Sequence, residues 1–252
     1  MLDNHLLEKL SGNVAADIRR RLKPFDFIHG DILAEPNTVI DRMIFPRSGL
    51  ISIVVELDSG DQIEAGIVGR RGALGGAAIF GAEHHLHAAV SQVSGGAWSM
   101  PIADAKDLAS TSAQFRGLIL AQEQYLLAEA WQFAACNAKH LVIQRLCSWL
   151  LRARDEAGGS ELLMIQENMA KMLGVQRASV SMLASQLQEE GLISYRRGRI
   201  HVSDPEGLRD RACSCYRTLG EQHEHLFAGR TRRNIGADRR HGDGPAEGPS
   251  LD

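Results

Sequence analysis

The order of hydrophobic and polar positions divides the chain into a β-rich part and a helical part. From about residue 29 to 101, short apolar runs alternate with turns rich in glycine. Runs of this length, broken by turn-forming residues, are typical of strands in a sandwich or a small barrel. The clearest runs are VIDRMIF, LISIVVEL, QIEAGIV and HAAVSQV. We therefore predict an all-β domain here.

Helical periodicity begins at about Ala113 and carries apolar residues on two faces of one long helix. One row contains Phe115, Ile119, Leu126, Ala130 and Phe133, and the other contains Leu120, Leu127, Trp131 and Ala134. A single β domain covers one face of a helix, so we expect this helix to pair with its counterpart in a second copy. We take the first row as the candidate dimer residues. Burial of both faces within one chain stays open as the alternative.

A second helical segment, HLVIQRLCSWLLRARD, and a Gly158-Gly159-Ser160 connection precede the most informative stretch, which runs from residue 166 to 193. Its pattern predicts two short helices joined by a tight turn at Gly174, a residue type that tolerates positive φ. Ala170 is small where the two helices cross, and Val180 and Leu183 are spaced to pack against the first helix. The second helix then turns a different set of side chains outward: Gln176, Arg177, Ala178, Ser181 and Met182.

The next segment, ISYRRGRIHV, predicts two short strands around Arg197-Gly198 with three arginines at the tip. A helix-turn-helix followed by such a hairpin is a winged helix, which reads duplex DNA. Residues 163 to 202 contain five basic and three acidic residues, whereas the whole chain has a net charge of -3. Positive charge is thus concentrated where phosphates would bind. The alternative is a protein-binding helix pair with a solvated RRGR loop, which explains fewer of these spacings.

Length and composition are those of an ordinary globular protein with room for two domains: 252 residues, 44% hydrophobic and 23% charged. We find no signal-peptide pattern and no apolar run near the roughly 20 residues that a membrane helix requires. We therefore expect a cytoplasmic protein without a membrane partner. The four cysteines show no C-x-x-C pair and fall in segments predicted to be helical, so we expect reduced thiols and assign no metal.

These patterns predict an α+β fold with an N-terminal all-β domain, a long dimerisation helix and a C-terminal winged helix-turn-helix domain; the resemblance described next implies that the β domain is a jelly-roll sensor domain. The predicted parts are a helical lead-in at 1–28, a β-roll at 29–110, the dimerisation helix at 111–137, the DNA-binding domain at 138–205, a C-terminal helix at 206–228 and a disordered tail at 229–252.

This order of parts, together with FPRSGLISIVVELDSGDQIEAGIVGRRGALGG and QENMAKMLGVQRASVSMLASQLQEEGLISYRRGRI, resembles the CRP/FNR family of bacterial transcription regulators over about residues 25 to 205. The resemblance implies a cyclic-nucleotide-binding-type jelly roll that senses a signal and a long helix that forms a homodimer. It also implies two winged helices that read a palindromic double-stranded site near a promoter, where they meet RNA polymerase.

The resemblance does not identify the effector. At the family's phosphate-binding cassette, Gly72-Ala73 keeps the glycine and loses the glutamate, and His87-Ala88 stands where an arginine and a serine bind the phosphate. Without those charged partners we do not expect cyclic AMP to bind. No cysteine precedes Cys136, so the iron-sulfur cluster of oxygen-sensing relatives is not expected either.

Two further groups of residues are candidate sensor sites, but we assign no role to either. His84, His85 and His87 are close enough in sequence to bind a metal or haem, but a solvated turn explains them better. Arg70 and Arg71 could attract an anion, but paired arginines in a glycine-rich bend are more often just exposed. We assign no cofactor.

Within the DNA-binding part, the resemblance assigns Arg177 to a guanine, a contact worth about 1 to 3 kcal/mol of discrimination. Ala178 and Met182 replace a glutamate and an arginine of the family, so we expect apolar contacts from them, and Ser181 completes the base-contacting set. The expected phosphate contacts are Gln166, Gln176, Ser179, Arg196, Arg197 and Arg199. Ile165 stands where relatives often have a capping threonine.

We therefore expect a homodimeric, sequence-specific regulator that binds duplex DNA. The alternative is a ligand-sensing adaptor that acts mainly through protein partners. An enzyme is the least expected class, because we find no nucleophile-base pair, metal triad or phosphate loop. The sequence does not reveal the effector, the operator, or whether the protein activates or represses.

Overall fold

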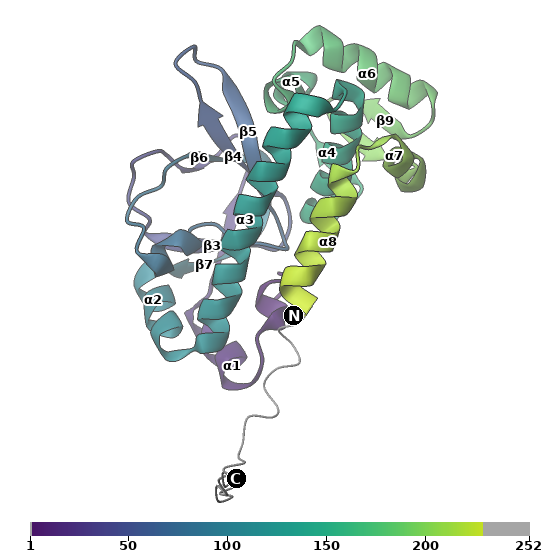
Figure 1. Cartoon of the computed structure of the whole chain (residues 1–252). Helices are drawn as coiled ribbons and strands as arrows, with labels where there is room; N and C mark the ends of the chain where they lie inside the picture. Colours follow the sequence, from purple (N-terminus) through teal and green to yellow (C-terminus); the bar gives the residue numbers. More distant parts are fainter. Residues whose placement is uncertain (1, 229–252) are drawn as a thin grey trace, which may run out of the picture.

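The computed structural model describes residues 2–228, which form a β-roll, a long helix beside it and a C-terminal helical module (Figure 1). The tail predicted at 229–252 lies outside the described residues. Within the part of the chain that is described, no helix combines the length and the apolar character needed to cross a membrane.

The β-roll consists of two antiparallel sheets that face each other, as predicted for residues 29–101. One sheet has the order β1-β7-β3 and the other the order β2-β6-β4-β5. Small and branched apolar side chains such as Ile44, Ile51 and Val68 fill the space between them. The strands are β1 Lys23–Phe27, β2 Ile32–Ala34, β3 Arg42–Pro46, β4 Leu50–Glu56, β5 Gln62–Val68, β6 Ala88–Val93 and β7 Gly95–Pro101.

The predicted helical lead-in at 1–28 is wrong at its end. A 3-10 turn, η1 (Leu7–Lys9), and helix α1 (Gly12–Arg21) are present, but the chain then enters β1. β1 is an edge strand, paired only with β7. An edge position tolerates the missing N–H of Pro24, which weakens the sequence signal for a strand.

The β-roll also ends earlier than predicted. Residues from Ile102 to Thr111 form helix α2, not the last part of the roll. The strand before it, β7, begins with Gly95 and Gly96 and was not among the predicted runs. A Cβ on Gly95 would stand 2.2 Å from the carbonyl oxygen of Ser48, so the close approach of two backbones requires glycine there.

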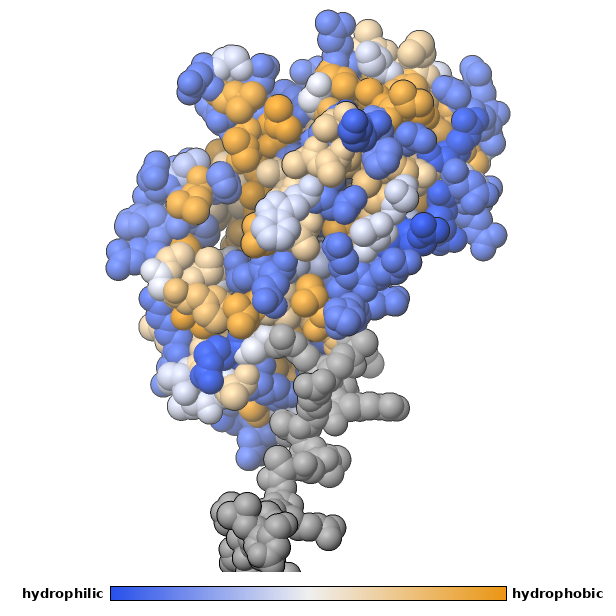
Figure 2. Space-filling view, in the orientation of Figure 1, coloured by the Kyte–Doolittle hydropathy of each residue, from blue (hydrophilic) through white to orange (hydrophobic). Residues whose placement is uncertain are grey.

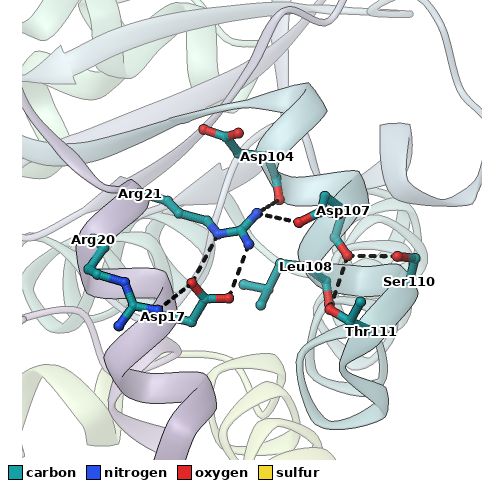
Figure 3. A network of polar contacts seen from close by, with 8 residues as sticks. All are labelled: Asp17, Arg20, Arg21, Asp104, Asp107, Leu108, Ser110 and Thr111. Carbon is teal, nitrogen blue, oxygen red and sulfur yellow. Dashed lines mark hydrogen bonds and ion pairs between the residues drawn. The ribbon is translucent and has the colours of Figure 1, made fainter.

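An arginine joins α1 to α2 at the closed end of the roll (Figure 3). Nη1 of Arg21 donates to Oδ2 of Asp107 at 2.7 Å and to the carbonyl oxygen of Asp104 at 3.1 Å. On its own helix, Nε and Nη2 of Arg21 donate to the carboxylate of Asp17, one turn earlier. The same guanidinium therefore orients both helices against the roll.

Helix α3 (Ala113–Lys139) runs along the roll and beyond it to the C-terminal module (Figure 1). Ser112 caps its first turn by accepting a hydrogen bond from the Phe115 N–H at 3.1 Å. The following elements are α4 Val142–Ala157, β8 Glu161–Leu163, α5 Gln166–Leu173, α6 Arg177–Glu189, β9 Ile193–Arg196, β10 Arg199–Val202, α7 Pro205–Arg211 and α8 Cys215–Ala228.

The single C-terminal helix predicted at 206–228 is two helices, α7 and α8, separated by residues 212–214. The break has a physical reason, because the two helices belong to different cores. Leu208 of α7 is buried in the core of the C-terminal module, whereas Phe227 of α8 is buried among residues of η1, α1, α2 and α3. Cys213 consequently lies outside any helix, contrary to the expectation that all four cysteines are helical.

Candidate nucleic-acid interface

The turn between α5 and α6 has the geometry predicted for a helix-turn-helix. Gly174 adopts φ 62°, and Val175 N–H donates to the Ala170 carbonyl at 3.0 Å, which closes the end of α5. Nη2 of Arg145, on α4, donates to the Leu173 carbonyl at the same end. The end of α5 is thus held both by the turn that follows it and by α4.

The inner face of α6 packs on α5 as the sequence predicts. Val180 is fully buried in the same cluster as Met169 and Leu173, and Leu183 is half-buried against it. Ala170 is 5% exposed, which agrees with a small residue at the crossing. Ile165 begins α5 without a side-chain hydrogen bond to the helix, so the cap that the resemblance places there is missing.

The outer face of α6 is free in the described chain. Arg177 and Ala178 are exposed, and Met182 is 67% exposed. The Ser181 hydroxyl donates to Oε1 of Gln166 at 2.8 Å, which brings one predicted base contact and one predicted phosphate contact together. Gln176 is exposed before the helix and Ser179 is half-buried in its first turn.

The wing is an antiparallel hairpin in which Arg196 pairs with Arg199 across a two-residue turn. Both turn residues have positive φ, 50° at Arg197 and 74° at Gly198, as a type I′ turn requires. Arginine is an uncommon residue at such a φ, because its Cβ crowds the backbone. All three arginines of the tip are exposed, and Nη1 of Arg199 lies 3.5 Å from the carboxylate of Glu161 on β8.

A buried polar network joins this module to the roll. On β5, the Glu64 carboxylate accepts from the indole N–H of Trp149 on α4 at 2.7 Å and from the Ser52 hydroxyl on β4. Burial raises the pKa of Glu64 to about 7, against the opposite effect of these two hydrogen bonds. Beside it, Arg152 of α4 forms a buried ion pair with Glu129 of α3.

The arginine pair in the glycine-rich bend is only partly exposed. Nε of Arg71 donates to Oε1 of Glu156 on α4 at 2.6 Å, and the Arg71 side chain is 23% exposed. The expectation that both arginines are simply exposed is therefore wrong, because Arg70 is half-buried as well. The charge of Arg71 holds α4 against the roll.

The long helix presents one face to its own chain and the other to solvent, which corrects the predicted dimer residues. Phe115 and Ile119 are fully buried in their own chain, so they are not available to a partner. The other three residues of that row, Leu126, Ala130 and Phe133, are half-buried. The exposed row is the second one, in which Leu120, Leu127 and Trp131 are 44%, 50% and 67% exposed.

The structure places the predicted effector residues in different surroundings. Ala73 is buried in the core beneath α2 and α3, and a Cβ on Gly72 would meet the amide of Gln122 at 2.7 Å. His87 is exposed, and Ala88 starts β6. A cavity of about 410 Å³ beside β2 and β3 is lined by other residues, among them His85. His84 and His87 lie exposed in the turn between the 3-10 helix η2 (Gly76–Phe80) and β6.

Sequence reasoning missed the network around Glu64. Its one signal was a carboxylate near the middle of the mostly apolar strand QIEAGIV. Which residues satisfy that carboxylate depends on the docking of α4, and no local pattern contains that information.

Comparisons with known proteins agree with this geometry. Residues 144–211 match the family of Crp-like helix-turn-helix domains. Solved structures with a similar fold include FixK2 from Bradyrhizobium japonicum, with a TM-score of 0.65 at 14% identity, covering 76% of this chain and 98% of that one. They also include the c-di-GMP-responsive global regulator CLP from Xanthomonas campestris, with a TM-score of 0.61 at 16% identity, covering 76% of this chain and 99% of that one.

A third similar structure is a mutant of CooA from Carboxydothermus hydrogenoformans, with a TM-score of 0.58 at 16% identity, covering 82% of this chain and 94% of that one. No curated protein matches the sequence. Residues 144–211 are therefore a Crp-like helix-turn-helix domain, set within a chain that has the fold of the CRP/FNR family of transcription regulators.

Proposed function

We propose that this protein is a homodimeric transcription regulator that binds a palindromic site in duplex DNA. The observation that carries the proposal is the joint exposure of the α6 outer face and the arginine-rich wing tip on one Crp-like module. A helix of this exposure fits the major groove, and the wing adds positive charge beside it.

The two sets of side chains have different tasks in this proposal. Arg177 reads a guanine through its two hydrogen-bond donors, while Ala178 and Met182 contact thymine methyl groups and Ser181 contacts a base edge once it leaves Gln166. The remaining set binds phosphates, which supplies affinity without sequence information. It consists of Gln166, Gln176, Ser179, Arg196, Arg197 and Arg199.

The exposed row of α3 supports a homodimer. Leu120, Gln124, Leu127, Trp131 and Ala134 are all exposed and follow one another at spacings of four, three, four and three residues. This is the spacing of the seam of a two-stranded coiled coil. Figure 2 shows apolar surface among polar residues over the part of the molecule where α3 lies. Pairing along it would set two α6 helices in successive major grooves, roughly 34 Å apart.

We do not propose cyclic AMP as the effector. The two positions where the family binds ribose and phosphate carry Ala73, which is buried among apolar side chains, and His87, which is exposed. Neither position offers the charged partner that a cyclic nucleotide needs. Near a promoter, the bound dimer would meet RNA polymerase.

The decisive experiment is selection of the purified, ligand-free protein on random DNA duplexes, followed by sequencing of the bound pool. We expect a palindromic motif, and the variant Arg177→Ala should lose its preference at one base pair in each half-site. A folded dimer that enriches no motif, alone or with cell extract added, would contradict DNA reading. That result would favour an adaptor that acts through protein partners.

A further inference from the structure

Four side chains with metal-binding atoms meet where α3 ends and α8 begins. Cys136 is in the last turn of α3, His140 follows that helix, Cys213 is in the break between α7 and α8, and Cys215 starts α8. Their ligand atoms all lie within 4.8 Å of one another. The three cysteines are buried, and His140 is half-buried.

We propose that Cys136, His140, Cys213 and Cys215 hold one tetrahedral metal ion of the zinc class. A zinc-sulfur bond of about 2.3 Å places two sulfur ligands of a tetrahedron about 3.7 Å apart. The Sγ atoms of Cys136 and Cys213 are 3.5 Å apart, and Sγ of Cys215 is 3.5 Å from Nδ1 of His140. Ligand atoms this close leave room for a single ion and not for an iron-sulfur cluster, whose own atoms stand between its ligands.

Polar N–H and O–H groups around the sulfurs resemble the outer shell of a metal-thiolate site. Nε2 of Gln132 donates to Sγ of Cys215 at 3.0 Å. The Ser148 hydroxyl and the Cys215 N–H are directed at Sγ of Cys213. Cys147 is different, because it packs among apolar side chains in the core of the C-terminal module and is not part of this cluster.

Cys213 and Cys215 fall in a segment predicted to be one helix, where residues two apart point in different directions, so we expected no metal. The break at 212–214 removes that objection. Cys136 and His140 are four residues apart, which puts both on the same face at the end of a helix. The C-x-x-x-H and C-x-C spacings were present as signals, but they are about 75 residues apart in the chain and only the packing of α8 on α3 unites them.

The position of the site suggests what the ion would do. The Crp-like domain at 144–211 begins just after His140 and ends just before Cys213. The ion would therefore join the two points at which that domain leaves and rejoins the rest of the chain, and both would be held to the end of α3. We expect loss of the metal to weaken the attachment of the Crp-like domain to α3.

Metal content of the full chain, purified under reducing conditions from zinc-supplemented medium, tests the site directly. We expect one zinc per chain by mass spectrometry, and cobalt(II) in its place should give the sulfur-to-cobalt absorption of a tetrahedral thiolate site. Cys213→Ser and Cys215→Ser should lose the ion. His140→Cys should keep it, because four thiolates also bind zinc, and the matched control Cys147→Ser should keep it too.

Two further measurements leave all four proposed ligands in place. A chelator should lower the midpoint of thermal unfolding of the unmodified protein, and Gln132→Leu should weaken zinc binding by about tenfold. Absence of both zinc and the cobalt band in the unmodified chain would overturn the proposal. So would equal metal loss in Cys147→Ser. None of these readouts involves DNA, so they stand or fall apart from the proposed function.

Discussion

At the scale of single residues, Arg197 shows a conflict between the backbone and the side chain. Its φ of 50° suits glycine or asparagine, yet the position carries an arginine at the exposed tip of the wing. Strain of this kind costs about 1 kcal/mol or more and persists where function requires it. The residue is thus best explained by what its charge binds.

Replacement of Arg197 by asparagine should separate these two effects. Arg197→Asn relieves the crowded φ, so we expect the free energy of unfolding to rise by up to about 1 kcal/mol. The same change removes the proposed phosphate contact, so affinity should fall for all duplexes alike, and the slope of log K against log salt should decrease by about 1. Denaturant titration and binding at several salt concentrations measure both. A change in sequence preference would contradict the assignment to phosphate.

Glu64 is a second residue whose surroundings set a measurable property. Its folded-state pKa of about 7 lies above the ordinary value of 4.5, so the folded protein retains a proton that the unfolded chain loses. Stability should therefore be complete below the ordinary pKa and fall as the pH rises toward 7. Above that pH the loss is complete, because both states are then ionised.

Glu64→Gln should remove this dependence on pH. We expect the variant to be more stable than the unmodified protein by less than about 1 kcal/mol at about pH 5, and by about 3 kcal/mol at about pH 8. The measurement is urea unfolding across that range, with the exposed Glu83→Gln as the control that should leave the profile unchanged. If the free energy of unfolding changed with pH in the same way for Glu64→Gln and the unmodified protein, the pKa of Glu64 would not be raised by burial.

At the scale of elements, the sequence predicted best where the signal is local. The turn at Gly174 and the hairpin at Arg197-Gly198 follow from residue types that favour positive φ, and both are present. The strand β1 and the break between α7 and α8 were missed, and the dimer was assigned to the row of α3 that the structure buries in part. Each depends on what packs against the element, which no short window of sequence contains.

The turn of the helix-turn-helix offers a test of local control. Gly174→Ala should cost about 1 kcal/mol of unfolding free energy, because a Cβ there is strained at positive φ although its nearest neighbour, Cδ1 of Ile63, is 3.9 Å away. Gly174→Asn should cost less, since asparagine tolerates this conformation. Gly159→Ala, where φ is not positive and nothing crowds the added Cβ, should cost nothing in the same thermal-unfolding measurement. Equal losses at the two glycines would contradict the argument.

At the scale of the whole molecule, the two apolar faces of α3 have different roles. The face that contains Ile119 packs against the roll and is buried. The sequence shows that α3 has two apolar faces, but not which of them the roll covers. The exposed face borders a groove of about 770 Å³ between α3 and α8, lined in part by Leu127 and Trp131. A second copy of α3 laid along this stripe would cover both residues.

Leu127→Glu tests this arrangement, because it places a charge at the centre of the exposed row of α3. In a parallel pair of helices, that charge also lies opposite the same charge on the partner. Desolvation and repulsion together should convert the proposed dimer to monomers at micromolar concentration, as measured by sedimentation equilibrium. Leu86→Glu is the matched control, since Leu86 is 79% exposed in the loop before β6, far from α3 in sequence. It should leave the dimer intact.

The Leu127→Glu monomer should keep its helical content and lose its preference for palindromes over single half-sites, because each half-site is then bound alone. If Leu127→Glu remained a dimer, the copies would have to pair through another surface, and the spacing of the two recognition helices would have to be derived from that surface instead.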